Sequence, residues 1–206
     1  MKNYKKNFEI LKKNHVYSEE MEHDACGVGL IASTEGKKSR KIVEYGIEAL
    51  KAVWHRGAVD ADGKTGDGAG IHVEIPKDFF IEKIEVTGHT HDNSEICVGM
   101  IFLPRNDYAA QESCKTIVES ELTKNDFSIY GWRQVPVNPK VLGEKAFQTM
   151  PEIIQVLFKS NNPELLNKDL ERKIYETRRI IENKAFKISL NNFYICSLSS
   201  KSIIYK

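Results

Sequence analysis

The residues best suited to chemistry begin at Cys26. Gly27 follows this cysteine at once, and the apolar run continues to Ala32, which predicts a thiol at the start of a buried strand over residues 26–33. A thiol in such a position can act as a nucleophile, and Gly27 allows another group to approach the backbone closely. A lone cysteine in an apolar run is more often a small core residue, so the sequence alone leaves both interpretations open.

The residues that precede Cys26 give the nucleophile hypothesis a mechanism. Residues 1–25 are polar, and their apolar positions are too few and too irregular to predict a core element. We expect a terminal extension or a short propeptide that ends at Ala25. Cleavage there would make Cys26 the first residue. Its α-amine, with a reference pKa of about 7.7–8.0, would be partly neutral near pH 7 and could take the thiol proton.

A His-Arg-Gly motif at residues 55–57 follows a predicted helix over about residues 40–54 and has two interpretations. His55 and Arg56 near a helix C-terminus interact well with the last carbonyl groups, and Gly57 would adopt the left-handed conformation that ends many helices. The local pattern favours this structural cap. The second interpretation makes the same residues part of a site around Cys26.

A glycine-rich stretch follows, with five glycines within 14 residues that end at Gly70. This composition predicts a loop with unusual backbone demands. The stretch lacks the Lys-Ser/Thr pair and the strand-loop-helix context of a phosphate-binding loop, which argues against a nucleotide site. His89 and His91 lie in a polar loop and are expected to be solvated. We expect no metal site, because no histidines or cysteines have metal-ligand spacing.

Composition and charge exclude several classes of protein. The 206 residues fit one domain or most of one, and 30 Lys+Arg against 29 Asp+Glu leave a net charge of +1 without a long block of one sign. A nucleic-acid surface based on bulk charge is therefore not expected. Four scattered cysteines argue against a disulfide framework. No apolar run reaches the roughly 18 residues of a membrane span, and the N-terminus does not resemble a secretory signal. We expect a cytoplasmic protein.

Periodicity and turn residues predict the remaining elements. Helices are expected near residues 106–122, 139–150 and 167–184, and strands at residues 71–75, 95–103, 132–137, 151–158, 193–198 and 202–205. The strand at 132–137 should be an edge strand, because Pro136 lacks a ladder donor. The last two strands should pair with each other around residues 199–201. Short turns between neighbouring strands favour an α+β layered sandwich. Three cysteines are expected to be inert core thiols: Cys97, Cys114 and Cys196.

Several motifs in their order along the chain resemble the start of the large subunit of glutamate synthase. They are Asp-Ala-Cys-Gly-Val-Gly-Leu-Ile-Ala at 24–32, His-Arg-Gly-Ala at 55–58, Asp-Gly-Lys-Thr-Gly-Asp-Gly-Ala-Gly-Ile at 62–71, Gly-Trp-Arg-Gln-Val-Pro at 131–136 and Phe-Tyr-Ile-Cys-Ser-Leu-Ser at 193–199. The resemblance implies a class II glutamine amidotransferase domain of the N-terminal-nucleophile type, with an αββα layered sandwich. It would span residues 26–206 and be incomplete at the C-terminus.

This resemblance implies roles for Cys26, Arg56 and Gly57, to which the sequence itself adds Gly27. Cys26 would attack the side-chain amide of L-glutamine, release ammonia for glutamate synthesis and form a thioester that water hydrolyses. Arg56 would support the nucleophile, while Gly57 would let its loop pass close to the site and Gly27 would support the site from the strand. The implied partner is the remainder of the glutamate synthase large subunit, and the implied setting is ammonia assimilation.

The sequence departs from the family pattern in its downstream motifs. The family holds the glutamine carboxylate with an arginine in His-Ser/Gln-Arg-Phe-Ser-Thr-Asn and forms its oxyanion hole in Ala-His-Asn-Gly-Glu, and neither motif occurs here. Loss of one oxyanion donor typically costs about 3–4 kcal/mol in the transition state, so the isolated chain should be inactive. FMN and the iron–sulfur cluster are expected only in the missing remainder, with no cofactor in this chain. The alternative is a non-catalytic or split fragment that acts as a binding or assembly module and needs a separately encoded remainder.

Overall fold

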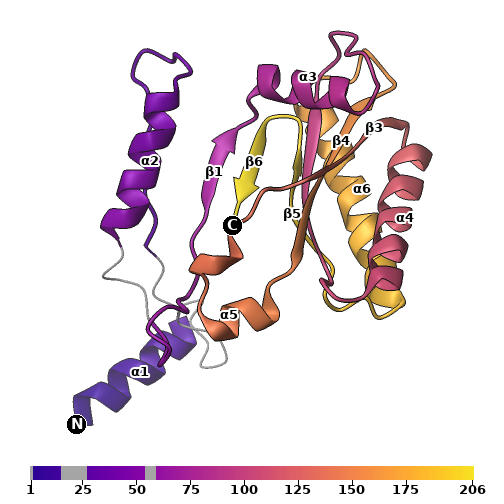
Figure 1. The fold of residues 1–206 in the computed structure, drawn as a ribbon. Helices are drawn as coiled ribbons and strands as arrows, with labels where there is room; N and C mark the ends of the chain where they lie inside the picture. The colour runs from indigo at the N-terminus through magenta and orange to yellow at the C-terminus, as the bar shows by residue number, and fades with distance from the viewer. Residues whose placement is uncertain (1, 15–26, 54–58) are drawn as a thin grey trace.

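The computed structural model of the chain describes residues 2–14, 27–53 and 59–206 (Figure 1). Helices and antiparallel sheets are mixed along these residues, which confirms the predicted α+β class. Three of the predicted site residues, Cys26, Arg56 and Gly57, lie outside the described residues.

The described elements follow one another along the chain as helices and strands in mixed order. The helices are α1 (Lys2–Asn14), α2 (Arg40–Ala52), α3 (Lys77–Val86), α4 (Tyr108–Lys124), α5 (Glu144–Thr149) and α6 (Asn167–Lys187), with a 3₁₀ turn at Pro139–Val141. The strands are β1 (Ile71–Glu74), β2 (Cys97–Leu103), β3 (Phe127–Gln134), β4 (Glu152–Ser160), β5 (Tyr194–Ser199) and β6 (Ser202–Tyr205).

A four-stranded antiparallel sheet in the order β3-β4-β2-β5 forms the centre of the molecule. Six of the seven residues of strand β2 are buried. At Gly99, in the middle of β2, a Cβ atom would lie 2.6 Å from both Leu198 Cδ1 and Val156 Cγ1, so the neighbouring side chains fill this space. Strand β3 is at the edge of the sheet, as predicted, although it begins earlier and ends before Pro136.

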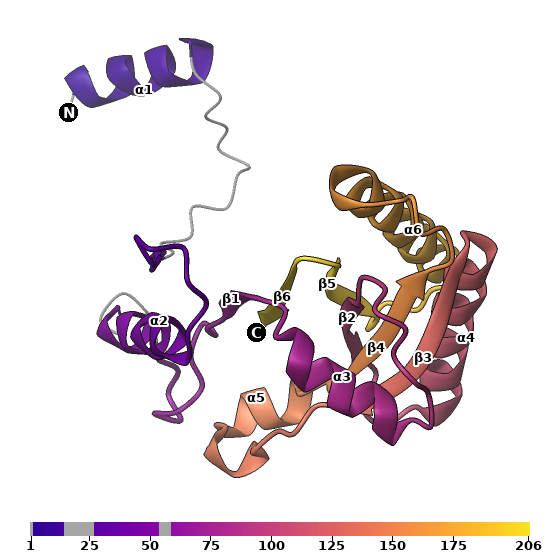
Figure 2. The same cartoon turned by 90° about the horizontal axis from the view of Figure 1, so that it is seen from above.

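Two hydrophobic cores cover the two faces of this sheet. Helices α4 and α6 pack on one face through residues such as Val118 and Ile174. On the other face α3 and β6 supply Phe80, Ile84 and Ile203, all fully buried. Strand β6 pairs with β1 in a separate two-stranded antiparallel sheet, and α2 contacts β1. Seen from above, the elements follow one another as α4 and α6, the four-stranded sheet, the two-stranded sheet and α2 (Figure 2).

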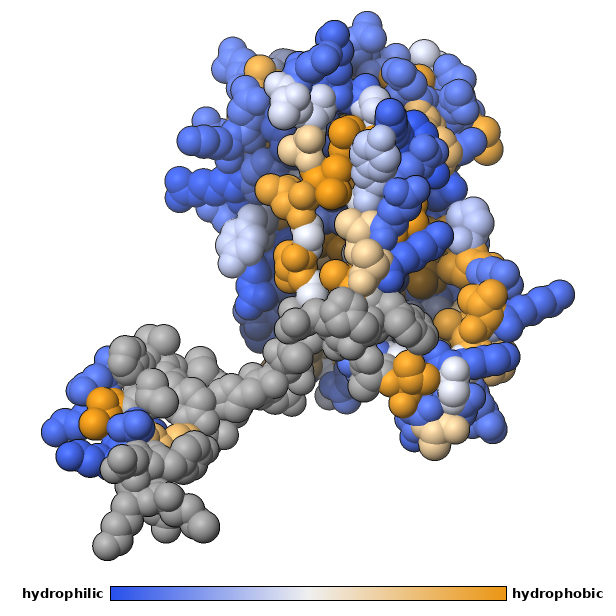
Figure 3. Space-filling model, turned by 90° about the vertical axis from the view of Figure 1, so that its left-hand side faces the viewer, coloured by the Kyte–Doolittle hydropathy of each residue, from blue (hydrophilic) through white to orange (hydrophobic). Residues whose placement is uncertain are grey.

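The prediction of a buried strand at residues 26–33 is wrong for its described part. Residues 27–33 form no strand, and the side chains of Val28 and Leu30 are 91% and 89% exposed. Figure 3 shows the side of the molecule that lies on the left in Figure 1, and apolar side chains are visible on it. An extended segment becomes a strand only when a neighbouring strand takes its backbone hydrogen bonds, and no described strand pairs with this one.

The predicted pairing of the last two strands is also wrong, because β5 belongs to the four-stranded sheet and β6 to the two-stranded sheet. The turn between them is fixed by Glu171 of α6. Its carboxylate accepts hydrogen bonds from Ser199 Oγ at 2.9 Å and from both the backbone N and Oγ of Ser200 at 2.7 Å. The chain therefore crosses from one sheet to the other at a point held by a helix.

Three helical features differ from the sequence expectation. The segment expected as one helix at residues 139–150 is split into the 3₁₀ turn and α5. Helix α3 was not predicted, and it buries Phe80 and Ile84 in the second core. Helix α1 lies within the predicted polar extension, and it carries no acidic residue in its first turn and two lysines in its last.

Candidate functional site

Gly27 is the one predicted site residue within the described part of the chain, and it packs against the end of α2. A Cβ atom at Gly27 would lie 3.3 Å from Val53 Cβ and 3.4 Å from Val53 Cγ2. Gly27 directly follows Cys26, and Val53 stands three positions before Arg56. The structure therefore brings together the backbone after the candidate nucleophile and the helix end before the His-Arg-Gly motif, which are far apart in sequence.

Helix α2 ends next to Val53, the residue that packs against Gly27. Its end is regular, since the backbone N of Val53 donates to the carbonyl of Ala49 at 3.2 Å. Ser39 is the N-cap residue of α2 but makes no side-chain cap hydrogen bond. The helix contacts β1 at a glycine, where a Cβ at Gly46 would lie 3.3 Å from Ile71 Cδ1. The structural-cap interpretation of residues 55–57 lies outside the described residues.

The glycine-rich stretch forms a compact loop, as the sequence predicts. Val59 and Gly66 form a β-bridge, and the backbone N of Asp60 donates to the carbonyl of Thr65 at 2.7 Å. Gly63 has a φ of +68°, in the region that favours glycine. After the loop the chain enters β1, which pairs with β6 in the two-stranded sheet.

The carboxylate of Asp62 organises this loop. Its Oδ1 accepts from the backbone N of Lys64 at 2.9 Å and of Thr65 at 2.7 Å, and its Oδ2 accepts from Thr65 Oγ1 at 2.5 Å. These hydrogen bonds, with the Thr65 hydroxyl first, hold the pKa of Asp62 well below its usual range. Asp62 is therefore an anion with a structural task and is not suited to proton transfer near neutral pH.

A second group of titratable residues lies far from α2, around Tyr130 of β3. Its hydroxyl donates to Asp92 Oδ1 at 3.3 Å, and Asp92 also forms an ion pair with Lys159. The hydrogen bond from Lys159 lowers the pKa of Asp92, while burial raises the pKa of Tyr130. The partners satisfy one another and attach the loop before β2 to β3 and β4, which is a structural function.

The two histidines of this loop are partnered by polar groups of the protein. His89 Nδ1 is 3.1 Å from Thr87 Oγ1, and His91 Nε2 donates to the carbonyl of Ser94 at 3.0 Å. Within residues 2–14, 27–53 and 59–206, no group of three or more His, Cys, Asp or Glu side chains is arranged to hold a metal ion.

The cysteines of the described segments are free and buried, as expected of core thiols: Cys97, Cys114 and Cys196. Burial raises the pKa of all three, that of Cys114 to about 11. Because the thiolate is the reactive form, these residues are poor nucleophiles.

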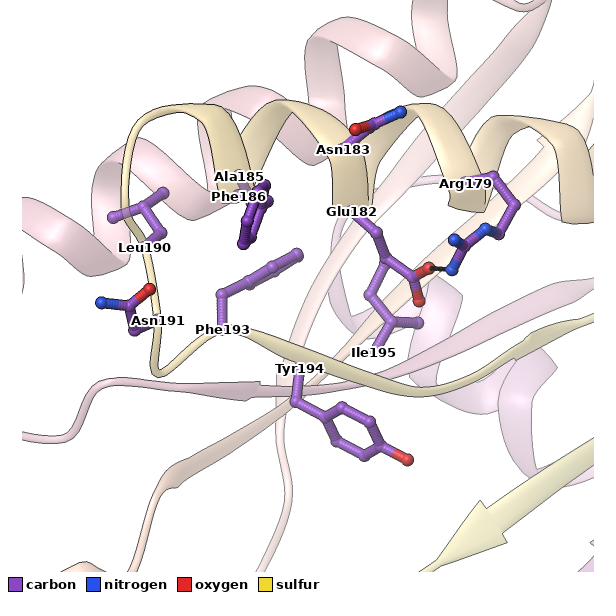
Figure 4. A pocket seen from close by; sticks show the side chains of 10 residues that line it. All are labelled: Arg179, Glu182, Asn183, Ala185, Phe186, Leu190, Asn191, Phe193, Tyr194 and Ile195. Carbon is purple, nitrogen blue, oxygen red and sulfur yellow. Dashed lines mark hydrogen bonds and ion pairs between the residues drawn. The ribbon is translucent and has the colours of Figure 1, made fainter. Parts of the chain in front are cut away.

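Two grooves elsewhere on the surface contain none of the predicted site residues. One, with a volume of about 450 Å³, lies between α6 and the start of β5, where Phe186 and Phe193 face each other and Arg179 pairs with Glu182 (Figure 4). The other, of about 510 Å³, lies beside the Asp92–Lys159 ion pair. Their charged side chains are paired within the protein.

Comparison with known proteins decides the family. A sequence profile described as "Glutamine amidotransferases class-II" matches residues 26–206. The chain belongs to this family. It is 52% identical over 203 residues to the NADPH glutamate synthase large chain of Azospirillum brasilense, an alignment that covers 98% of this chain and 13% of that one.

Ferredoxin-dependent glutamate synthases are also similar to this amidotransferase chain. That of Pyropia yezoensis is 40% identical over 205 residues, and the alignment covers 96% of this chain and 13% of the relative. The chloroplastic synthase 2 of Arabidopsis thaliana is 38% identical over 203 residues, and the alignment covers 97% of this chain and 12% of the relative. The resemblance read from the motifs is confirmed. The chain spans about an eighth of the length of these relatives. None of the described helices is both long and apolar enough to cross a membrane.

Proposed function

We propose that this chain is the glutaminase part of a glutamate synthase, which releases ammonia from L-glutamine for the synthesis of glutamate. The observation that carries the proposal is the class-II amidotransferase match, which begins at Cys26 and continues to the last residue. The high identity to a glutamate synthase large chain supports the synthase context. The alternative of a non-catalytic assembly module is favoured by no contact among the described residues.

The fold proposed for the domain is the αββα sandwich of the N-terminal-nucleophile hydrolases. Its support is the order of elements in Figure 2, with α4 and α6 outside the four-stranded sheet and α2 outside the two-stranded sheet. In this proposal residues 1–25 are a propeptide or an extension, and residues 26–206 are the first part of the domain.

The proposed reaction uses Cys26 as both nucleophile and base. After cleavage behind Ala25, the free α-amine takes the proton of the thiol, and Sγ attacks the carbonyl carbon of the glutamine side chain. The resulting tetrahedral intermediate collapses when its C–N bond breaks, and the nitrogen leaves as ammonia with the transferred proton. Water then hydrolyses the γ-glutamyl thioester, which yields glutamate and restores the thiol.

Arg56 and Gly57 are proposed to line the same site. Consecutive Cα atoms are about 3.8 Å apart, so the Cα of Arg56 lies at most about 11 Å from that of Val53, and the Cα of Cys26 about 4 Å from that of Gly27. The contact between Val53 and Gly27 therefore supports a common neighbourhood for Cys26 and Arg56. A substitution at Gly27 would push against Val53, which is consistent with a supporting role for this glycine.

The remainder of the large subunit is the proposed partner. It would supply the arginine that holds the glutamine carboxylate and the donors of the oxyanion hole, so we expect residues 1–206 alone to have little glutaminase activity. It would also hold FMN and the iron–sulfur cluster. The three described cysteines do not fit a cluster, because each is buried and they form no ligand group. A cytoplasmic location is part of the same proposal.

Replacement of Cys26 in the complete synthase tests the proposal. Cys26→Ser should lower glutamine-dependent glutamate formation by about 10³-fold or more, as expected for loss of a nucleophile. Ammonia-dependent formation should be unchanged, because added ammonia enters after the amidotransferase step. Cys114→Ser is the control, and it should keep both activities because this thiol is buried. Glutamine-dependent activity that survives in Cys26→Ser would contradict the proposed function.

A further inference from the structure

The loop of residues 59–66 packs against the start of α5, and this contact is unusually tight. A Cβ atom at Gly143, which precedes α5, would lie 2.2 Å from Thr65 Oγ1, 2.3 Å from Asp62 Oδ2 and 2.6 Å from the backbone N of Thr65. Real Cβ atoms do not approach neighbours so closely. The φ of Gly143 is −73°, which any residue can adopt, so glycine is required here by space and not by backbone conformation.

Polar contacts also hold the loop against α5. The carboxylate of Asp62 lies against the start of α5, where the backbone of Glu144 helps to lower its pKa. Lys145 Nζ forms an ion pair with Asp60 Oδ2 at 2.5 Å. The ion pair of Asp60 therefore attaches the loop to the helix, and the carboxylate of Asp62 packs beside it.

Helix α5 is in turn attached to the body of the protein. The guanidinium of Arg105, just after β2, stacks over the ring of Phe147 with 4.7 Å to its centroid, and Nη1 donates to the Phe147 carbonyl at 3.5 Å. A continuous set of contacts thus runs from the central sheet through α5 to the loop of residues 59–66, which lies near α5 in Figure 1. The loop begins one residue after the His-Arg-Gly-Ala motif at 55–58.

We infer that the close contact of Gly143 with Asp62 and Thr65, which we call the seat, positions residues of the amidotransferase site. The five residues 54–58, which include Arg56, lie between two described contacts. Val53 packs at Gly27 on one side, and Val59 forms a β-bridge with Gly66 in the loop on the other. Gly143 acts through the loop and touches no reacting atom. This inference rests on the proposed function, because it assigns the seat a task in glutamine hydrolysis.

The experiment is Gly143→Ala in the complete glutamate synthase, assayed with glutamine and, separately, with ammonia. The added methyl displaces the loop, and a misplacement of about 1 Å can cost up to about 100-fold in rate. We expect kcat/KM for glutamine to fall by about 10- to 100-fold while ammonia-dependent synthesis stays unchanged. The unchanged ammonia activity reports that the synthase part is intact. A thermal melting curve equal to that of the wild type reports that the amidotransferase part is folded, which a merely structural role would not leave unchanged.

Two further variants change the loop contact without adding a side chain at Gly143. Asp62→Ala removes every contact of the carboxylate, whereas Asp62→Asn keeps an acceptor for the loop amides and should restore part of the glutamine activity. The control is Gln148→Ala, on the exposed side of α5, which should behave as wild type.

The outcomes separate the inference from the proposed function. Wild-type glutamine kinetics in Gly143→Ala, or equal losses with glutamine and ammonia, would overturn the positioning role. Either result can occur while Cys26→Ser still abolishes glutamine use, in which case the proposed function stands. If Cys26→Ser keeps glutamine-dependent activity, the proposed function fails, and the positioning role fails with it.

Discussion

Some glycines lie where no larger side chain would fit, and the sequence indicates only some of these positions. Gly63 lies in a stretch whose composition predicts a loop, and its positive φ agrees with that prediction. Gly99 and Gly143 stand in ordinary surroundings in the sequence. Their need for glycine arises from side chains that are distant in the chain, such as Leu198 and Thr65, so local patterns carry no signal for it.

Gly99→Ala is expected to destabilise the fold. The added methyl would lie 2.6 Å from Leu198 and Val156, and overpacking of this kind costs about 1–3 kcal/mol in the free energy of unfolding. Urea denaturation followed by circular dichroism measures the difference. Gly29→Ala is the matched control, because nothing lies within 4 Å of its added methyl, and its change should stay below about 1 kcal/mol. Equal effects of the two substitutions would contradict the packing argument.

The described cysteines show what residue-level reasoning can and cannot reach. Their apolar surroundings in predicted strands and helices indicate burial correctly. The same argument applied to Cys26 predicts a buried strand, and the residues that follow it are exposed. The nucleophile hypothesis therefore depends on the family motifs and not on the local pattern.

Elements with strong periodicity were predicted well, and their partners were not. Helix α6 and strands β2 and β4 agree with their predicted positions to within a few residues, because burial on one or both faces leaves a local pattern. Strands β5 and β6 belong to different sheets, and the turn between them is held by Glu171 of α6, a contact that the local sequence of the turn does not reveal. Residues 27–33 have the composition of a strand, but pairing is decided by neighbours that a local pattern does not reveal.

The junction between α4 and α6 gives a prediction for stability and its dependence on pH. The side chain of Glu121 is only 5% exposed and pairs with Lys184 of α6 at 2.5 Å and Lys124 at 3.3 Å. These partners, Lys184 first, lower the pKa of Glu121. The charged form therefore stabilises the fold above the ordinary carboxyl pKa of about 4.3, and this contribution disappears as the pH falls through the lower pKa of the folded protein.

Glu121→Gln should lower the free energy of unfolding at pH 7 by about 1–3 kcal/mol, and the loss should shrink below about pH 4. Denaturation curves at several pH values measure both effects. Glu112→Gln in the same helix is the control, because its partner is Lys115 at the same i,i+3 spacing but its side chain is 71% exposed. Exposed pairs contribute about 0–1 kcal/mol. A loss that is independent of pH would exclude the ionic explanation.

At the scale of the whole molecule, the described residues form two hydrophobic cores and two sheets, and the chain spans about an eighth of the length of the relatives that it matches. The family and the α+β class were predictable because several motifs at the right spacing occur along the chain. The site was predictable only in part. Gly27 and Val53 come together in the fold, whereas the contribution of α5 to the loop at residues 59–66 joins positions about eighty residues apart and has no local signal.

The central claim is that Cys26 becomes the first residue and acts as the nucleophile of the glutaminase. The most direct measurement is the intact mass of the mature synthase chain, combined with labelling by an electrophile that mimics glutamine and peptide mapping of the label. The account predicts a chain that begins at Cys26 and a single label on that residue, because only a free α-amine can serve its thiol as base. A label on Cys97, Cys114 or Cys196, or full glutaminase activity with residues 1–25 still attached, would contradict it.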